Sequence, residues 1–496
     1  MKIRNIILGI ALTLGCGACN DWLTVQPETV IVEEDMCTTD EGVKQLLSGM
    51  YYTMRTLYSP AYPLGGGDGL AEGLACTWNP SGERLIALAN RDYTTTNSVR
   101  YLLNNTFRDL YNVIAMANDF VKAAEQNKGK LTESVYNIGM GEALAIRAYC
   151  HLDLIRLWGP MPSRVDAGKN YLPYVTVNDP NPYEYISFER YMTLLLEDLD
   201  RAEEFLLASD PVVTNTFEST DQANVEWRYR KSRINYYGVL GLQARARLWN
   251  GDTEGALSYA RKVINAENED GTTKVRLMTL KEDGQEYQPG SNIWLLGDPS
   301  AYAEHLCGIK CDDWNWEKGP WTGPTGVQKV LYIEGVSGSE TAHRATEFRE
   351  LFDNKTTDFR YSRVWQVSVI AGGVIVTANF QKYKGFYISS TNTCQMNFPL
   401  IRLSEMYLMV MEKAPLDEAN AAWEKFSAAR EVAYVPYTEA DRQERVYKEW
   451  IREFLGEGQN FYTYKRLGKD RMYFNTQLIT EDQYVLPIPE KEFLNN

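Results

Sequence analysis

Three tryptophans lie close together in a stretch of the sequence that has no regular apolar periodicity. The segment DWNWEKGPWTGPTG, residues 313–326, contains Trp314, Trp316 and Trp321 among glycines, prolines and charged side chains. An exposed tryptophan is costly, and a loop has no regular apolar face that could bury three indole rings. We therefore expect these rings either to cap a hydrophobic core or to offer flat faces to a ligand.

A second group of residues has the side-chain types of a zinc site. His305, Cys307 and Cys311 lie close together in the sequence. A single C-x3-C pair with one upstream histidine and no second pair of ligands is a weak zinc pattern. A disulfide within the loop, or two reduced thiols, fits the same spacing better, so we expect no metal site here.

The sequence lacks the common catalytic signatures. It contains no H-E-x-x-H, no G-x-S-x-G and no Walker loop, and its three histidines, His151, His305 and His343, form no acid–base or metal pattern. GDGLAEG, residues 67–73, departs from the dinucleotide fingerprint in the spacing of its last glycine. We therefore expect a protein that is not an enzyme and that needs no cofactor.

The overall composition is that of a folded protein with an acidic surface. The 496 residues are 44% hydrophobic, 12% aromatic and 24% charged, which suits two or three domains or one extended repeat architecture. The formal net charge is -15, and the acidic residues are spread evenly along the chain. A nucleic-acid-binding surface needs a basic stripe, which this sequence does not contain, so we do not expect nucleic acid as a partner.

The first residues, MKIRNIILGIALTLGCGAC, have the pattern of a secretion signal. Two basic residues precede a short apolar run, Ile6–Leu14, and small residues with a cysteine follow. The run is too short to span a bilayer, which takes about 20 apolar residues as a helix. We interpret residues 1–18 as a lipoprotein signal peptide with Cys19 as the lipidated residue. Cys16 is the competing position, and an ordinary cleaved signal is the alternative.

Helical periodicity dominates most of the remaining chain. In GEALAIRAYCHLDLIRLW, residues 141–158, apolar side chains recur every three or four positions and form one stripe. Cys150 falls within this pattern, so we expect it in the core. The same period is found in three further segments, residues 101–126, 188–208 and 236–249. These segments follow one another with short breaks and predict consecutive helices.

The clearest helix pair spans residues 244–266. ARARLWNGDTEGALSYARKVINA reads as a helix, an Asn-Gly-Asp turn and a second helix with Ala256, Ala260 and Val263 on its inner side. Small residues at such positions allow two antiparallel helices to approach closely, as in the tetratricopeptide hairpins that stack into a solenoid. No fixed repeat period runs through the chain, so any repeats are degenerate and separated by insertions.

Two long stretches interrupt the helical pattern. Residues 63–100 and about 268–398 lose helical periodicity and are loop-like in composition. Within the second stretch, VSVIAGGVIVTA, residues 367–378, has two β-branched runs around a Gly-Gly pair and predicts a β-hairpin. Long irregular excursions on a helical scaffold usually carry binding function. Helical patterns return at residues 400–412, 416–432 and 440–456.

Two pairs of charged residues fall inside helical patterns: Glu142 with Arg147, and Arg402 with Glu405. An ionic group within a packed helix needs a partner, because an unpaired buried charge is costly. We expect these residues to tie helices together rather than to perform chemistry.

Several segments of the sequence together resemble the SusD/RagB family, the surface lipoproteins that Bacteroidetes pair with a TonB-dependent outer-membrane transporter. They occur in the family's order from end to end: CNDWL after the leader, LYNVIAMAN (110–118), GEALAIRAYCHLDLIRLWGPMP (141–162), EDLDRAEEFL (197–206), the helix pair at 236–266, FPLIRLSEMYLMVMEKA (398–414), EFLGEGQNFYTYKRLGK (453–469) and VLPIPEKEF (485–493). One stretch departs from the family pattern, because KFSAAREV, residues 425–432, stands where members commonly have an N-x-R-x-R-like sequence.

The resemblance implies a fold, a location and a role. It implies one domain over residues 19–496, with about four tetratricopeptide-like units in helical repeats at about 40–266 and 398–460. We therefore predict an all-α dominated fold, a right-handed solenoid of helical hairpins with loop and short β-hairpin insertions. The resemblance also implies a lipid-anchored protein, exposed at the cell surface on the outer membrane, that captures oligosaccharide or polysaccharide and delivers it to a SusC-like TonB-dependent transporter barrel.

A glycan-binding face needs aromatic rings with polar partners beside them. Sugar rings pack their C–H bonds on tryptophan or tyrosine faces, while Asp, Asn and Arg side chains bind the hydroxyl groups. On this view the resemblance implies one wall of Trp314, Trp316 and Trp321 with Trp294 and Tyr302, an opposite wall of Trp78 and Tyr93, and polar partners Asp68, Arg84 and Asn315. The alternative is that about half of these aromatic side chains plug the irregular region onto the helices.

Three functional classes remain open from the sequence: glycan uptake, the same uptake role for oligopeptides, and a scaffold solenoid that binds only protein. A glycan site requires exposed aromatic platforms, whereas a peptide site requires an enclosed groove with groups that pair with a peptide backbone. The tryptophan-rich segment favours glycan uptake, since a pure scaffold gives no reason for exposed tryptophans.

Overall fold

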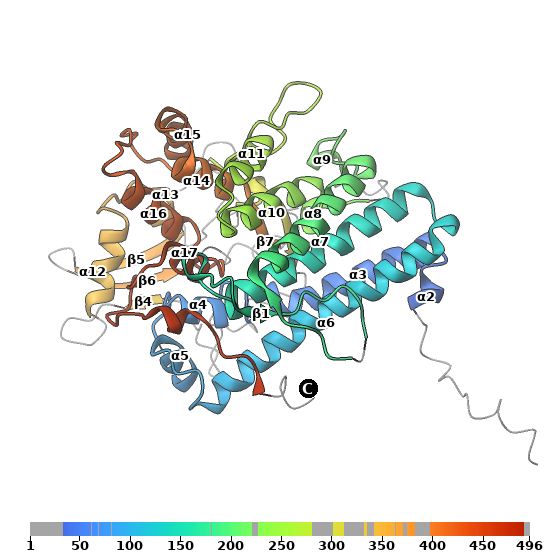
Figure 1. The fold of residues 1–496 in the computed structure, drawn as a ribbon. Coiled ribbons are helices and arrows are strands. Elements are labelled where there is room, and N and C mark those ends of the chain that lie inside the picture. The colour runs from blue at the N-terminus through green and yellow to red at the C-terminus, as the bar shows by residue number, and fades with distance from the viewer. Residues whose placement is uncertain are drawn as a thin grey trace, which may run out of the picture.

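The computed structural model describes residues 33–490, apart from positions 61, 68, 81, 180, 221–226, 280–300, 312–331, 335–341, 363, 371–373, 381 and 383–396. Helices dominate this part of the chain and pack in layers, and small sheets lie between and beside them (Figure 1). The helix-dominated fold predicted from the sequence is confirmed.

Four long helices build the first half of the scaffold: α3 (Asp40–Tyr58), α6 (Asn97–Asn127), α7 (Glu133–Trp158) and α8 (Phe188–Ser209). A short helix, α2 (Glu33–Met36), precedes them. The α7 helix packs against the other three long helices and is buried along most of its length, and Cys150 lies in the core as predicted. Side-chain caps fix two of the starts, since Thr39 accepts from the Gly42 amide and Ser187 from the Arg190 amide.

The predicted helix pair at residues 236–266 is confirmed as α10 (Tyr236–Trp249) and α11 (Thr253–Ile264). The turn between them needs Gly251, whose φ of +79° lies in the left-handed region that favours glycine. Asp252 then caps α11 by accepting from the Gly255 amide. The α11 helix packs on α14 (Leu403–Lys413), so this hairpin joins the two halves of the scaffold.

The C-terminal helices follow the predicted segments closely. After α14 come α15 (Leu416–Ala429), α16 (Arg442–Glu453) and α17 (Asn460–Leu467). The stretch expected to be irregular at 63–100 instead contains two short helices, α4 (Leu70–Leu74) and α5 (Gly82–Ala89). The α4 helix is too short to give a periodic signal, and it is held by contacts with α17 and α5. The other short helices are α9 (Phe217–Thr220), α12 (Ala342–Leu351) and α13 (Phe359–Ser362).

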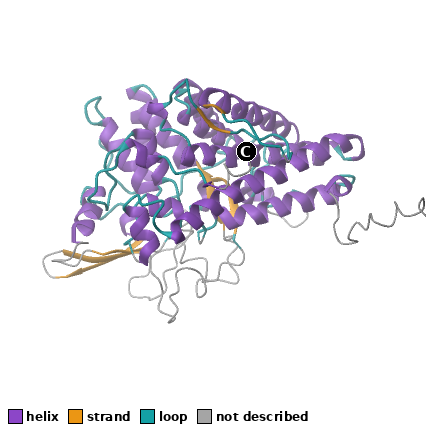
Figure 2. Cartoon of the chain, turned by 60° about the horizontal axis from the view of Figure 1, so that its bottom comes forward, coloured by secondary structure: helices purple, strands orange, loops and turns teal. Residues whose placement is uncertain are grey.

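The strands form three small antiparallel sheets within the described residues. β1 (Asn170–Leu172) pairs with β2 (Ile186–Ser187), and β3 (His305–Lys310) pairs with β7 (Asn397–Arg402). The predicted β-hairpin is confirmed as β5 (Trp365–Ile370) and β6 (Val374–Phe380), and β4 (Tyr332–Glu334) adds a third strand to β6. The β4–β6–β5 sheet projects from one end of the helical body (Figure 2).

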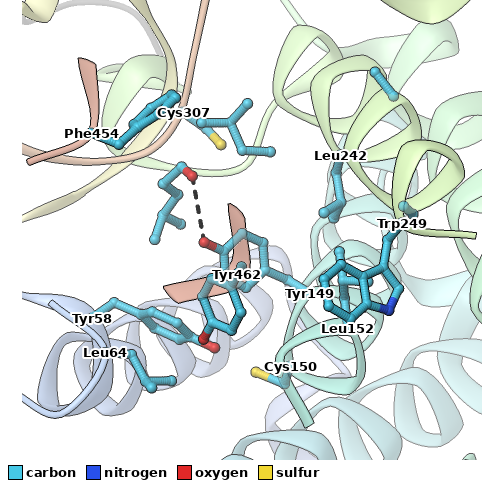
Figure 3. Packing of buried hydrophobic residues seen from close by; sticks show 14 of the residues in the cluster. Tyr58, Leu64, Tyr149, Cys150, Leu152, Leu242, Trp249, Cys307, Phe454 and Tyr462 are labelled. Carbon is cyan, nitrogen blue, oxygen red and sulfur yellow. Dashed lines mark hydrogen bonds between the residues drawn. The ribbon is translucent and has the colours of Figure 1, made fainter. Parts of the chain in front are cut away.

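One continuous hydrophobic core joins the helices to these sheets. Figure 3 shows part of it, to which Tyr149 and Leu152 of α7, Trp249 of α10, Tyr462 of α17 and Cys307 of β3 all contribute. Elements far apart in the sequence therefore share one hydrophobic core, and the strands that flank the irregular stretches are packed into it.

Two of the four charged residues singled out in the helical patterns, Arg147 and Glu405, tie α-helices together, and all four have partners other than those paired in the sequence. Glu142 accepts from Arg230 and Arg233, and Arg147 pairs with Asp198. Glu405 pairs with Arg245, and Arg402 joins a larger network. Residues on one helix that are close in sequence point to different neighbours, so sequence proximity did not reveal these partners.

Candidate functional site

Four of the side chains predicted for the ligand face lie in the described residues: Trp78, Arg84, Tyr93 and Tyr302. The other predicted residues, Trp294, Trp314, Asn315, Trp316, Trp321 and Asp68, lie outside the described residues, and so does Cys19. The structure therefore describes both members of the predicted wall of Trp78 and Tyr93, but only Tyr302 of the opposite wall.

Trp78 is a core residue, which corrects its predicted place on an open wall. It is 5% exposed, and its ring packs against Phe380 and Trp365, with centroid separations of 5.2 and 5.9 Å. The indole Nε1 donates to the carbonyl of Gly67 at 3.0 Å. Trp78 thus fastens the stretch before α5 onto the β5–β6 hairpin, as the plugging alternative describes.

Tyr93 is also buried, so the second member of that wall is corrected in the same way. It is 8% exposed, and its hydroxyl donates to the carbonyl of Gln483 at 2.7 Å. Burial raises the pKa of Tyr93 to about 12. Its physical role is to hold the C-terminal segment against the chain that leads into α6.

Tyr302 and Arg84 are partly exposed. Tyr302 lies just before β3, and its ring contacts the ring of His305 at a centroid distance of 5.4 Å. Lys231 donates to the Tyr302 carbonyl at 3.2 Å and places its ammonium 4.9 Å from the ring centroid. Tyr302 therefore keeps an aromatic surface partly open to solvent beside a cation, which suits a polar ligand with apolar faces.

The strands place the described neighbours of two irregular segments side by side. In the sheet formed by β3 and β7, Lys310 lies opposite Asn397. The start of residues 312–331 and the end of residues 383–396 are therefore close together at this end of the sheet. In the β4–β6–β5 sheet Tyr332 lies opposite Asn379. The end of residues 312–331 is therefore close to the part of β6 that leads to residues 383–396. The tryptophan-rich segment and residues 383–396 are thus anchored in the same two places. Both anchoring points lie on one side of the helices in Figure 2.

A buried arginine stands at the end of the β3–β7 sheet. Arg402 is the last residue of β7 and is 1% exposed. Its Nε and Nη2 donate to the two carboxylate oxygens of Glu457 at 2.8 Å each. Its Nη1 donates to Glu304 at 2.9 Å and to Glu453 at 2.8 Å. One guanidinium therefore joins three carboxylates from two parts of the chain, Glu304 before β3 and the pair Glu453 and Glu457 at and just after the end of α16.

Two further arginines extend the network. Arg430, at the end of α15, donates to Glu304 at 2.8 Å and to Glu453 at 2.7 and 3.0 Å. Arg360 of α13 donates to Glu453 at 3.1 Å, to Glu449 at 2.7 Å, and to Asp358. We call Arg360, Lys382, Arg402, Arg430, Glu304, Glu453 and Glu457 the anchor network.

Glu453 of α16 is the centre of the anchor network. Burial by itself raises the pKa of a carboxyl, but Arg430, Arg402 and Arg360 outweigh burial and hold the pKa of Glu453 well below its usual range. Glu453 is therefore ionised at neutral pH, and each of its oxygens is bonded to guanidinium groups. Charged groups in such a site serve to fix geometry, because every one of them is already paired.

The possible zinc site at the start of β3 is not assembled in the described residues. No group of three or more potential His, Cys, Asp or Glu ligands comes together there. Cys307 is a thiol, and the Cys311 thiol donates to the carbonyl of Ile309 at 3.4 Å, so the spacing does not mark a disulfide between them. His305 instead contacts the side chain of Asn397 across the β3–β7 sheet at 3.1 Å.

The sequence did not predict the anchor network as a unit. The predicted pairing of Arg402 with Glu405 is wrong, and Arg430 lies in KFSAAREV, the stretch that departs from the family pattern. One available signal was the pair Glu449 and Glu453, four residues apart on α16 and next to the apolar residues Trp450 and Ile451. Buried charges on one helix face need partners, but the partners come from too far away in sequence to be identified by spacing.

Two sequence profiles match different parts of the chain. Residues 80–224 match a SusD-like family described as starch-binding and associating with the outer membrane. Residues 369–494 match the SusD/RagB profile, described as the SusD family. A SusD-like protein of Bacteroides ovatus is 23% identical over 305 residues, which cover 59% of this chain and 48% of that protein. SusD-like protein P25 of Formosa agariphila is 26% identical over 168 residues, which cover 33% of this chain and 31% of that protein. The chain thus matches less than half the length of these curated relatives.

Solved structures share the fold over nearly the whole chain. A SusD superfamily protein of Bacteroides thetaiotaomicron aligns with a TM-score of 0.63 at 19% identity, covering 92% of this chain and 97% of that one. A SusD-like carbohydrate binding protein of Bacteroides vulgatus aligns with a TM-score of 0.62 at 18% identity, covering 92% and 96%. At these identities the likeness concerns the fold.

Proposed function

We propose, from the premise that this chain belongs to the SusD/RagB family, that it captures oligosaccharide or polysaccharide at the cell surface and delivers it to a SusC-like TonB-dependent transporter. The observation that carries this proposal is the match of two profiles of that family, in order along the chain, one of them described as starch-binding. Members of this family act as binding proteins, and we propose that this chain likewise performs no catalysis.

We place the ligand face on the irregular segments that begin or end at the β3–β7 sheet and the β4–β6–β5 sheet. Trp314, Trp316 and Trp321, with Trp294 and Asn315, are the proposed contacts outside the described residues, and Asp68 is a proposed polar partner. Tyr302 supports this placement because its partly open ring lies directly before β3, which leads into residues 312–331. Arg84, partly exposed on α5, remains a proposed partner for hydroxyl groups.

Binding to a panel of purified polysaccharides and peptide mixtures tests this proposal. We expect Trp314→Ala and Trp316→Ala to weaken the best polysaccharide binder by about tenfold or more, since stacking on an aromatic ring contributes about 1–2 kcal/mol. Tyr434→Ala is the matched control, because this exposed tyrosine lies between α15 and α16, outside the segments proposed for the ligand face. If neither tryptophan variant weakens binding, the proposed site is wrong. If only peptides bind, the uptake role applies to oligopeptides.

We propose that Cys19 carries the lipid anchor and that a transporter barrel is the partner. Among the described helices, none combines the length and the apolar character that a membrane crossing requires. Co-purification after detergent extraction tests the partnership, and a chain that always emerges alone contradicts it. Incorporation of labelled fatty acid into the parent but not into Cys19→Ala tests the anchor; equal labelling of both would instead point to Cys16.

A further inference from the structure

Glu304 connects the two described ends of residues 280–300. Its Oε1 accepts from the backbone amide of Met278 at 2.9 Å, just before that segment begins. Glu304 itself lies three residues after Ala301, where the described chain resumes. The same carboxylate accepts from Arg430 through Oε1 and from Arg402 through Oε2. One fully buried side chain therefore fixes the entry and the exit of this segment to the helical scaffold.

The anchor network also binds the residue just before residues 383–396 and the far end of β7 (Asn397–Arg402), the strand that follows them. Lys382, at the start of that segment, forms an ion pair with Glu457. Both oxygens of Glu457 also accept from Arg402, which ends the strand that follows the segment. The entry of this second segment and the far end of the strand that follows it therefore meet at a single carboxylate.

These two carboxylates share one guanidinium. Arg402 donates to Glu304 and to Glu457, and Glu453 of α16 bonds to Arg402 and Arg430. The side chains in question are between 0% and 5% exposed, so water does not compete for their hydrogen bonds. Bidentate and bridged guanidinium–carboxylate bonds have narrow geometry, so they fix position as well as contribute energy.

We propose that Glu304 is a positioning residue of the ligand face: through the anchor network it sets where residues 280–300 begin and end, and where residues 383–396 begin, relative to α16. The inference rests on the proposed function, because it assigns to Glu304 an effect on ligand affinity without ligand contact. A purely structural residue would affect ligand affinity only through the stability of the fold. We expect a substitution of Glu304 to weaken ligand binding more than a substitution elsewhere that costs the same stability.

Glu304→Gln is the variant that tests this role, and Asp198→Asn is its matched control. Asp198 is 4% exposed and accepts from Arg147 at 2.7 and 2.5 Å, but it joins α7 to α8 within the scaffold. Each substitution removes a buried charge and turns one acceptor into a donor. We expect both variants to lose thermal stability, and only Glu304→Gln to lose polysaccharide affinity, by about tenfold or more. Equal affinity losses in the two variants, or less than about a twofold loss in Glu304→Gln, overturn the proposal.

Hydrogen exchange at the Met278 amide tests the anchoring without any ligand. We expect this amide to exchange at least about tenfold faster in Glu304→Gln than in the parent, and at the parent's rate in Asp198→Asn. Unchanged exchange in Glu304→Gln overturns the inference, even if polysaccharide binds. If the parent binds no polysaccharide, the proposed function fails while the exchange rates still decide whether Glu304 anchors the segment.

If Glu304→Gln does not fold, Lys382→Met tests the ion pair between Lys382 and Glu457 of the same network. Glu457 keeps both bonds to Arg402 in this variant, so we expect it to fold. The expected result is an affinity loss of about threefold or more, again with Asp198→Asn unchanged. Parent-like affinity in Lys382→Met counts against the proposal.

Discussion

Two buried arginines, Arg147 and Arg402, have similar chemistry but different neighbourhoods. Arg147 of α7 pairs with Asp198 of α8 and donates to Asn118 of α6 at 2.9 Å, so its partners come from helices adjacent in the chain. Arg402 joins Glu304, Glu453 and Glu457, which reach it from an irregular stretch, a helix and a turn.

The difference shows how much ion pairs contribute to the position of each region, the helices α6 to α8 and the stretches around β3, β6 and β7. Helices α6 and α8 have apolar stripes and α7 is buried on nearly every side, so apolar contacts already specify how the three helices pack, and Arg147 adds one ion pair to that packing. The strands β3 and β7 are also buried in the core, but the stretches that they join carry no helical stripe, so directed bonds add to apolar packing in fixing their position. Ion pairs therefore contribute more to position in the second region than in the first.

The largest expected effect is on stability when either arginine is removed. Arg402→Met leaves three buried carboxylates without their shared guanidinium, and we expect a loss of about 5 kcal/mol in the free energy of unfolding. Arg147→Met strips one carboxylate, Asp198, of its pair, and we expect a loss of about 3 kcal/mol. Urea unfolding monitored by circular dichroism measures both. A smaller loss for Arg402→Met than for Arg147→Met would contradict the comparison.

The next effect is a pH dependence of stability that comes from a carboxyl close to Glu457 of the anchor network. Glu72 of α4 is fully buried and accepts from the Gly458 amide at 2.7 Å. Burial, assisted by the nearby Glu457 carboxylate, raises the pKa of Glu72 to about 8. Because this folded-state value lies above the ordinary value of 4.5, the stability it contributes is complete below pH 4.5 and is lost as pH rises to about 8.

Glu72→Gln should remove this alkaline sensitivity. At about 1.4 kcal/mol per pH unit, the parent should lose about 2 kcal/mol relative to Glu72→Gln between pH 6 and pH 8. Urea unfolding across that range measures the difference. Glu412→Gln is the control, since Arg466 outweighs burial and lowers the pKa of Glu412 to about 2, so its contribution is lost only in acid. Parallel curves for the parent and Glu72→Gln would refute the assignment.

The smallest expected effect separates buried from exposed ion pairs of the same geometry. Arg261 and Glu418 form a bidentate pair at 2.8 Å, with each side chain 37% exposed, whereas Arg466 and Glu412 form one at 2.7 Å that is largely buried. We expect Arg261→Met to cost less than about 1 kcal/mol, and less than Arg466→Met. Thermal denaturation in low and high salt checks both. A larger loss for Arg261→Met would show that burial does not set the strength of these pairs.

Much of the helical scaffold could be predicted from periodicity and turn chemistry. Residues 236–249 form a helix over the same bounds, and the break at Asn250–Asp252 is the turn before α11. The Gly-Gly pair between two β-branched runs gave the β5–β6 hairpin. These features are local, since a few neighbouring residues carry all the information.

The candidate site was less predictable, because aromatic residue type does not indicate exposure. Trp78 and Tyr93 have the composition of a binding wall but are buried, with polar tips bonded to the carbonyls of Gly67 and Gln483. Gln483 lies far along the chain, so no local pattern could show that it covers Tyr93. Whether an aromatic ring binds a ligand or seals a core depends on which distant segment packs on it.

The sequence by itself determined the helical hairpins and their order, because amphipathic stripes, caps and glycine turns act over a few residues. Only the tertiary structure decided which carboxylates surround Arg402 and Arg430, and so where the irregular stretches are fastened. The physical reason is range: a helix is specified by neighbours one turn away, whereas a buried charge takes its partner from whichever segment folding brings within hydrogen-bond distance.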